Sequence, residues 1–205
     1  MRKIVIFLVV FSLFAFPVLA GPFSGGGYSL SPIISSTEFR FSQHIPLEVG
    51  YYSNLEKDTG FVFSFTGMIP TIESINIPTE TDSFESYSID YGINFGLNTR
   101  GAHWWRMAEN RNGVFSSLGV GAFAETHLAT YKELGTKVLH QRLYAGPSLV
   151  SDLFIPVGDN YLGFGIRDDI TLLELNIINT GAGSASDFRT VFYDGIKFSV
   201  FFTSR

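Results

Sequence analysis

The 205-residue chain contains no cysteine, and this absence excludes several classes of protein. A disulfide scaffold, a thiol nucleophile, a thiolate metal site and a lipid-modified cysteine all need one. After the first 20 residues the chain also lacks an apolar run of the ~18 residues that would indicate a membrane-spanning helix. Its net charge of −5 and the lack of a basic stretch argue against a nucleic-acid partner.

The histidines do not have the spacing of a metal site. His44, His103, His127 and His140 form no H-x-x-H or H-E-x-x-H pattern. No glycine-rich loop precedes a helix, so a phosphate cradle is not supported either. We therefore expect no catalytic residue, no metal and no cofactor, and an exported enzyme is the weakest of the alternatives.

Residues 1–20 are typical of a cleaved secretory signal peptide. Arg2 and Lys3 precede an apolar run, and Val18-Leu19-Ala20 fits a signal-peptidase site. The run is shorter than the ~20 residues that a spanning helix needs, which disfavours the alternative of an uncleaved anchor. We expect residues 21–205 to form one exported domain without disulfides.

Phenylalanine and glycine are abundant, with 21 of each, and the segment Ser86–Asn98 indicates how they are used. Its odd positions, Tyr87 to Leu97, are apolar, whereas its even positions are small or polar. This period of two predicts a strand with one apolar and one polar face. At a tilt of about 40° the apolar run rises roughly 26 Å, which matches the apolar band of an outer-membrane barrel.

Seven further segments read as strands, several of them longer than is usual in soluble sandwiches. We therefore predict an all-β fold: a closed, antiparallel, eight-stranded up-and-down transmembrane β-barrel. Its longer connections are expected at Pro70–Glu85, Thr99–Gly113 and Asn179–Asp187, and Gly25-Gly26-Gly27 reads as a flexible arm. The predicted strands are Tyr28–Phe41, Ile45–Ser53, Phe61–Ile69, Ser86–Asn98, Val114–Tyr131, Val138–Ile155, Tyr161–Ile178 and Thr190–Phe202.

Charged residues on the polar faces are predicted to form an interior charge network, because unpaired ions in a narrow lumen are costly. A structural plug of salt bridges is the favoured interpretation, ahead of a gated ion or solute path and of a catalytic cluster. Glu125 and Arg142 flank one short turn and are the expected pair. The predicted network contains Glu48, Asp90, Glu125, Arg142, Arg167, Asp169 and Lys197.

Two other groups have a predicted role at the ends of the barrel. Trp104 and Trp105 suit a membrane-interface anchor, or equally a short loop or helix packed under the barrel. Four isoleucines after the third strand could line a hydrophobic mouth or pack their own loop down. They are Ile69, Ile72, Ile75 and Ile77.

The last strand resembles the C-terminal insertion signal of outer-membrane proteins. An aromatic residue is followed by a glycine and then by apolar residues at alternate positions, namely Tyr193, Gly195, Phe198, Val200 and Phe202. The chain departs from that signal by continuing for three residues after Phe202. As a whole it resembles small eight-stranded outer-membrane barrels of the OmpW, OmpX and OmpA-transmembrane-domain type. The resemblance implies a bacterial outer-membrane location, with membrane lipids and the barrel-assembly machinery as partners.

Two functions are compatible with the predicted barrel, one for an outer-membrane protein and one for a soluble exported protein. The first is a non-enzymatic outer-membrane barrel with a structural or interaction role, or one that passes small or hydrophobic solutes and meets external ligands. The second is a soluble exported lipocalin-like barrel that binds a small hydrophobic ligand with its apolar faces turned inward. Periodicity alone does not separate the two orientations.

Overall fold

A computed structural model of the chain describes residues 21–34, 39–78, 84–87, 91–133 and 136–204. The expected signal peptide and Asp90 therefore lie outside the described residues. No described segment is a helix long and apolar enough to cross a membrane. The strands are β1 (Gly21–Ile34), β2 (Phe39–Tyr52), β3 (Thr59–Pro78), β4 (Phe84–Tyr87), β5 (Tyr91–Glu109), β6 (Phe115–Glu133), β7 (Thr136–Val157), β8 (Asn160–Thr180) and β9 (Gly183–Ser204).

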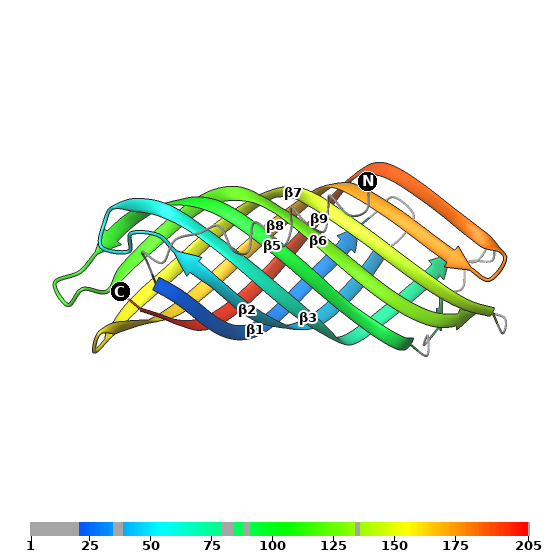
Figure 1. Cartoon of the computed structure of the whole chain (residues 1–205), viewed down its shortest axis with the longest axis horizontal. Coiled ribbons are helices and arrows are strands. Elements are labelled where there is room, and N and C mark those ends of the chain that lie inside the picture. The colour runs from blue at the N-terminus through cyan, green and yellow to red at the C-terminus, as the bar shows by residue number, and fades with distance from the viewer. Residues whose placement is uncertain (1–20, 35–38, 79–83, 88–90, 134–135, 205) are drawn as a thin grey trace.

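Eight strands form a closed antiparallel ring (Figure 1). The hydrogen-bonded order runs β2, β1, β9, β8, β7, β6, β5, β3, and pairing of β2 with β3 closes it. Among the described residues, strand β4 pairs with the far end of β3 alone and stands outside the ring. Chain neighbours are thus neighbours in space, which confirms the predicted up-and-down barrel.

The register fixes the tilt of the strands and the width of the lumen. Successive cross-strand partners, starting at Gly60 on β3, lead round the ring and return to β3 at Pro70, ten residues further along. For eight strands this stagger corresponds to a tilt of about 40° and an interior just wide enough for side chains. The partners on the way are Trp104, Gly119, Val150, Arg167, Lys197, Ser29 and His44.

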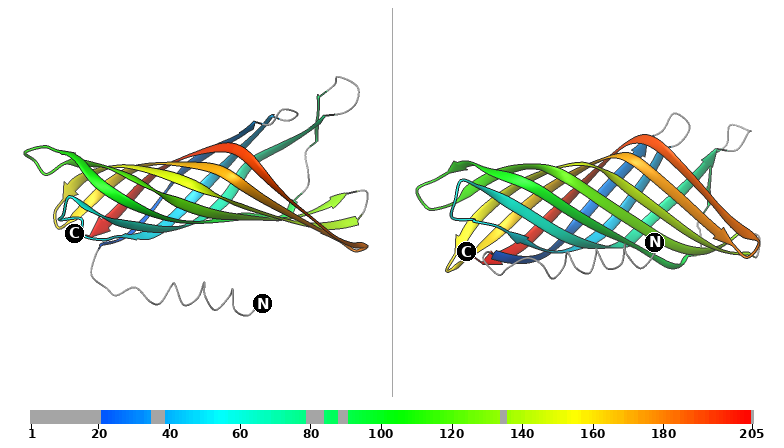
Figure 2. Two further views of the ribbon diagram at one scale, coloured as in Figure 1. Left: turned by 90° about the horizontal axis from the view of Figure 1, so that it is seen from above. Right: turned by 45° about the horizontal axis from the view of Figure 1, so that its top comes forward.

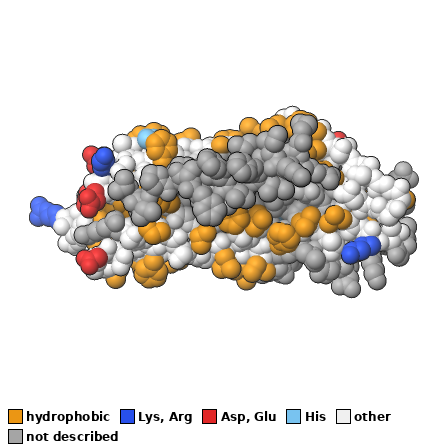
Figure 3. All heavy atoms as spheres, in the orientation of Figure 1, with side chains coloured by type: hydrophobic (Ala, Val, Ile, Leu, Met, Phe, Trp, Pro, Cys, Tyr) orange, Lys and Arg blue, Asp and Glu red, His pale blue; other side chains and the backbone are white. Residues whose placement is uncertain are grey.

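The outer face of the ring is apolar and the inner face is largely polar, as the alternation predicts. Figure 3 shows hydrophobic side chains along the visible wall, with most charged ones towards the ends. This is the opposite of the lipocalin-like orientation, in which the apolar faces would point inward. Exposed outward side chains include Val49, Phe61, Leu118, Val120, Leu149, Leu153, Phe164, Ile166, Phe198, Val200 and Phe202.

One end of the barrel carries the tight turns at 53–58, 110–114 and 158–159 together with Gly21 and Ser204; we call it the short-turn end. The β6–β7 and β8–β9 hairpins extend towards the opposite end, the long-hairpin end (Figure 2). Just inside the short-turn end, aromatic side chains fill the lumen, and we call them the aromatic floor. It consists of Phe23, Tyr52, Trp104, Phe115, Phe154, Tyr161 and Phe201.

Five sequence-based boundaries are wrong. Tyr28–Phe41, predicted as one strand, contains the end of β1 and the start of β2, and the predicted connection Pro70–Glu85 contains the end of β3 and the start of β4. The other three errors shorten a strand. Most of the predicted connection Thr99–Gly113 belongs to strand β5, which extends to Glu109. Inward and outward side chains keep alternating there, with Trp, His and Arg in place of Ile and Asn. Gly25-Gly26-Gly27 lies within β1, paired to β2 and β9, and is not an arm. Most of Asn179–Asp187 belongs to a β8–β9 hairpin whose polar residues still pair through their backbones.

Candidate functional site

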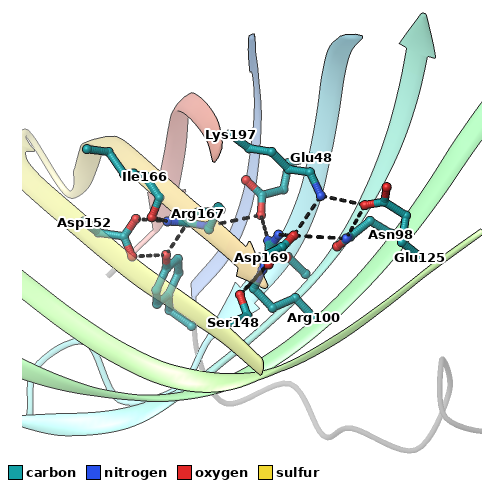
Figure 4. A network of polar contacts seen from close by, with 12 residues as sticks. Glu48, Asn98, Arg100, Glu125, Ser148, Asp152, Ile166, Arg167, Asp169 and Lys197 are labelled. Atoms are coloured by element: carbon teal, nitrogen blue, oxygen red, sulfur yellow. Dashed lines mark hydrogen bonds and ion pairs between the residues drawn. The ribbon is translucent and has the colours of Figure 1, made fainter. Parts of the chain in front are cut away.

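A charged layer crosses the lumen directly above the aromatic floor. Its side chains come from β2, β5, β6, β7, β8 and β9 and converge on the barrel axis (Figure 4). All but Glu125 are at most 4% exposed, so the layer fills the space between the strands. The charged layer consists of Glu48, Asn98, Arg100, Glu125, Ser148, Asp152, Arg167, Asp169 and Lys197.

Arg100 on β5 contacts three other residues of the layer. Its Nη2 and Nε atoms donate to the two carboxylate oxygens of Asp169, at 2.6 and 3.1 Å. Ser148 Oγ accepts from the same Nε at 2.8 Å and donates to Asp169 at 2.6 Å. Nη1 reaches Glu48 Oε1 at 3.4 Å. The two bonds from Arg100 to Asp169 form a bidentate pair, which is the strong form of an arginine–carboxylate interaction.

Arg167 on β8 joins the charged layer to the aromatic floor. Its Nη1 atom forms a short ion pair with Asp152, and its Nη2 donates to the Tyr52 hydroxyl at 3.0 Å. That hydroxyl donates in turn to Asp152 Oδ2 at 2.6 Å. Arg167 Nε lies 3.6 Å from Glu48, so Glu48 bridges the two arginines.

Lys197 on β9 completes the layer on the side of β6. Its ammonium group contacts Glu125 at 2.7 Å and Asp169 at 2.8 Å. Asn98 donates to the same two carboxylates, at 2.8 and 3.2 Å. The second oxygen of Glu125 lies 2.6 Å from His127 Nε2. Glu125 is therefore held on three sides.

The layer pairs four carboxylates with three cations, and His127 lies beside one of the carboxylates, Glu125. Each ion has an opposite charge within 4.0 Å, which is what a buried charge requires. No group of His, Asp and Glu in the described part of the chain has a metal-binding arrangement. An arrangement of mutually satisfied charges suits a seal across the lumen.

The structure brings five of the seven predicted network residues into this layer: Glu48, Glu125, Arg167, Asp169 and Lys197. Arg142 also faces the lumen and is 9% exposed, but it lies further towards the long-hairpin end, opposite His127. The bonds that hold Glu125 come from Lys197, Asn98 and His127, so its pairing with Arg142 stays a prediction.

Arg100 and Asp152 belong to the layer but were not predicted from the sequence. Arg100 lies in the stretch that was predicted to be a connection, although it continues the polar face of Ser86–Asn98 by one more step. Asp152 shares the parity of Arg142 and Tyr144 on β7. Continuing each alternation to the end of its strand would have found both residues.

The predicted membrane anchor divides between the two faces of β5. Trp104 is fully buried in the aromatic floor, so it is not a membrane anchor; this corrects the prediction. Trp105, its neighbour, is 44% exposed on the outer face near the short-turn end. Strand alternation separates the two rings, which a loop or a helix would not do.

The predicted hydrophobic mouth does not form around Ile69. This residue is 53% exposed and points away from the lumen. Ile72, Ile75 and Ile77 lie in the far part of β3, and their side chains are outside the described set. In the last strand, Phe198, Val200 and Phe202 face outward and Gly195 faces inward, as the insertion-signal pattern requires. The side chain of Tyr193 is not described.

Comparison with known proteins supports the fold. No family model matches the chain, and no curated protein sequence matches it. The structure is similar to that of a major outer membrane protein from Thermus thermophilus, with a TM-score of 0.50 and 9% identity over 90% of this chain and 99% of that one. The chain has the fold of small outer-membrane β-barrels.

Two further solved structures align with lower scores. Neisserial surface protein A gives a TM-score of 0.48 and 13% identity, over 89% of this chain and 96% of that chain. Ail, the attachment invasion locus protein of Yersinia pestis, solved in complex with the heparin analogue sucrose octasulfate, gives 0.41 and 11% identity, over 91% and 99%.

Proposed function

We propose that the protein is an integral outer-membrane barrel with a sealed lumen, without catalytic activity, that acts through its surfaces as a structural or interaction protein. The observation that carries this proposal is the double closure of the interior. Trp104, Tyr52, Phe154 and Phe201 are fully buried at one level, and the charged layer spans the next. Among the described residues, buried side chains at both levels occupy the space that a porin lumen keeps open.

The apolar wall supports the membrane location. Large hydrophobic side chains such as Phe61, Leu47 and Phe202 are 54–64% exposed on the outer face. A soluble protein rarely exposes an apolar surface that runs round its whole circumference. The tight turns at one end and the long hairpins at the other fit the inner and outer sides of such a membrane.

The long-hairpin end is the part that suits an interaction role. All residues from 181 to 187 are exposed, and the two strands at this tip of the β8–β9 hairpin pair through their backbones. Arg189 pairs there with Glu174 and Asp187, both at 3.3 Å. A hairpin of this kind presents a fixed surface outside the membrane.

Fractionation and conductance test the proposal together. The protein should be extracted from outer membranes only with detergent and should migrate faster on gels before boiling than after it. In planar bilayers the wild type should give no steady conductance, whereas a triple variant that opens both levels, Trp104→Ala with Phe154→Ala and Arg100→Ala, should leak. A soluble periplasmic pool, or a stable wild-type channel that the triple variant does not change, would overturn the proposal.

A further inference from the structure

The outer wall of the barrel carries an apolar groove of about 430 Å³ that plays no part in sealing the lumen. It crosses β3, β5, β6, β7, β8 and β9 on the outer face, so it opens away from the lumen. Its volume lies in the range of small-molecule sites. Glu125 and Tyr144 also border it, but their side chains are directed into the lumen, where Glu125 binds Lys197.

The register shows how the groove is built. One cross-strand row runs from Phe65 through Thr99, Ala124 and Ala145 to Leu173. Its three central members are small, so they form a floor between bulkier ends. A parallel row, one step closer to the long-hairpin end, forms a wall. That row contains Leu97, Thr126, Leu143, Leu175 and Phe188.

The groove has no charged group on its outward side that could hold a head group. The hydroxyl of Thr99 donates to the backbone oxygen of Ala124 at 3.3 Å, which satisfies it within the wall. What remains for a ligand is a channel of methyl, methylene and phenyl groups. Such a surface recognises a chain by contact area and not by hydrogen bonds.

We propose that this groove binds one acyl chain of a membrane lipid. The proposal rests on the membrane insertion proposed above, because the groove is continuous with the lipid-facing wall. Small side chains let the chain lie close to the backbone, with the row of Leu97 and Leu143 along one side and Phe65 and Leu173 at the ends. A second barrel is convex and would span the groove without filling it, so a lipid tail fits better than a second copy.

The test uses the protein inserted into phosphatidylcholine vesicles that contain a phosphatidylcholine with a diazirine midway along one acyl chain. After illumination, labelled residues are mapped by mass spectrometry. Labelling of Leu143 and Ala145 should exceed that of Val49 and Val120, outward residues elsewhere on the wall, by about tenfold, which corresponds to a preference of about 1.4 kcal/mol. Equal labelling of all four residues would overturn the proposal.

Two matched variants distinguish binding in the groove from general lipid contact. Ala124→Phe fills the floor, and Ala122→Phe adds the same ring two residues away, outside the groove lining. The first should abolish the enrichment and the second should keep it. If both variants keep the labelling enrichment, or if two protein copies cross-link at Leu143, the acyl-chain site is overturned.

Insertion is scored in the same samples by heat-dependent gel mobility. A barrel that inserts but is labelled evenly removes the acyl-chain site alone and leaves the proposed function intact. A chain that does not insert removes both.

Discussion

Removing the guanidinium group of Arg100 tests whether the charged layer holds the barrel together. In the variant Arg100→Met, Asp169 loses two hydrogen bonds and Glu48 loses one partner, although Lys197 and Arg167 still reach those carboxylates. Breaking one side of a buried ion pair typically costs about 3–5 kcal/mol. Because partners remain on both acids, we expect the lower limit, a loss of about 3 kcal/mol in the free energy of unfolding.

Urea unfolding of the barrel in detergent or vesicles, followed by tryptophan fluorescence and by gel mobility, measures this loss. Arg111→Met is the matched control. Arg111 is exposed in the turn at 110–114, so its loss should cost no more than about 0.5 kcal/mol. If the two variants unfold within experimental error of each other, the charged layer does not hold the barrel together.

Three further pairs of substitutions test other parts of the fold. Asp169→Leu should destabilise the barrel by about 3 kcal/mol, because it removes a partner of Arg100 inside the lumen. Asp168→Leu should stabilise it by about 1 kcal/mol, because Asp168 faces outward between Leu149 and Ile196. Equal effects of the two substitutions in urea unfolding would contradict the assigned faces. Phe154→Ala should cost about 3–5 kcal/mol, since the ring stacks on Phe115 at 4.5 Å, and clearly more than Phe164→Ala on the outer face. Gly27→Val should prevent folding, because its Cβ would lie 1.7 Å from the Phe198 oxygen, whereas Gly67→Val, with nothing within 4 Å, should still give a heat-modifiable barrel on gels.

The orientation of the strands could be predicted from the sequence because alternation is a local property. The polarity of Glu48, Asp169 and Lys197 relative to their neighbours places them inside any barrel whose apolar faces meet lipid. What alternation does not contain is the stagger between strands. Whether Arg100 meets Asp169, Glu48 or Glu125 depends on the ten-residue shift round the ring, and that shift is set by all eight pairings together.

The aromatic floor could not be predicted for a related reason. Phe23, Phe115 and Phe201 have the same residue type as the outward Phe61 and Phe198, and only their parity separates the two groups. Near the ends of strands the inner and outer residues are both aromatic, so the polar face has no local signature there. The sequence predicted an interior charge network, whereas the short-turn end of the lumen is filled with rings.

The charged layer and the floor together explain why this sequence selects one register. A slip of one residue on β5 would move Arg100 and Trp104 from the lumen to the outer face and bring His103 and Trp105 inside. An arginine on the lipid side of a barrel costs about 2–4 kcal/mol near the midplane, and the acids that it leaves behind in the lumen lose their partner. A lumen filled only with apolar rings would lose far less stability in the same slip, because the outer face is apolar too. The buried charges therefore contribute most by making the alternative pairings of the same strands unfavourable, and the rings below them fill the space that those pairings define.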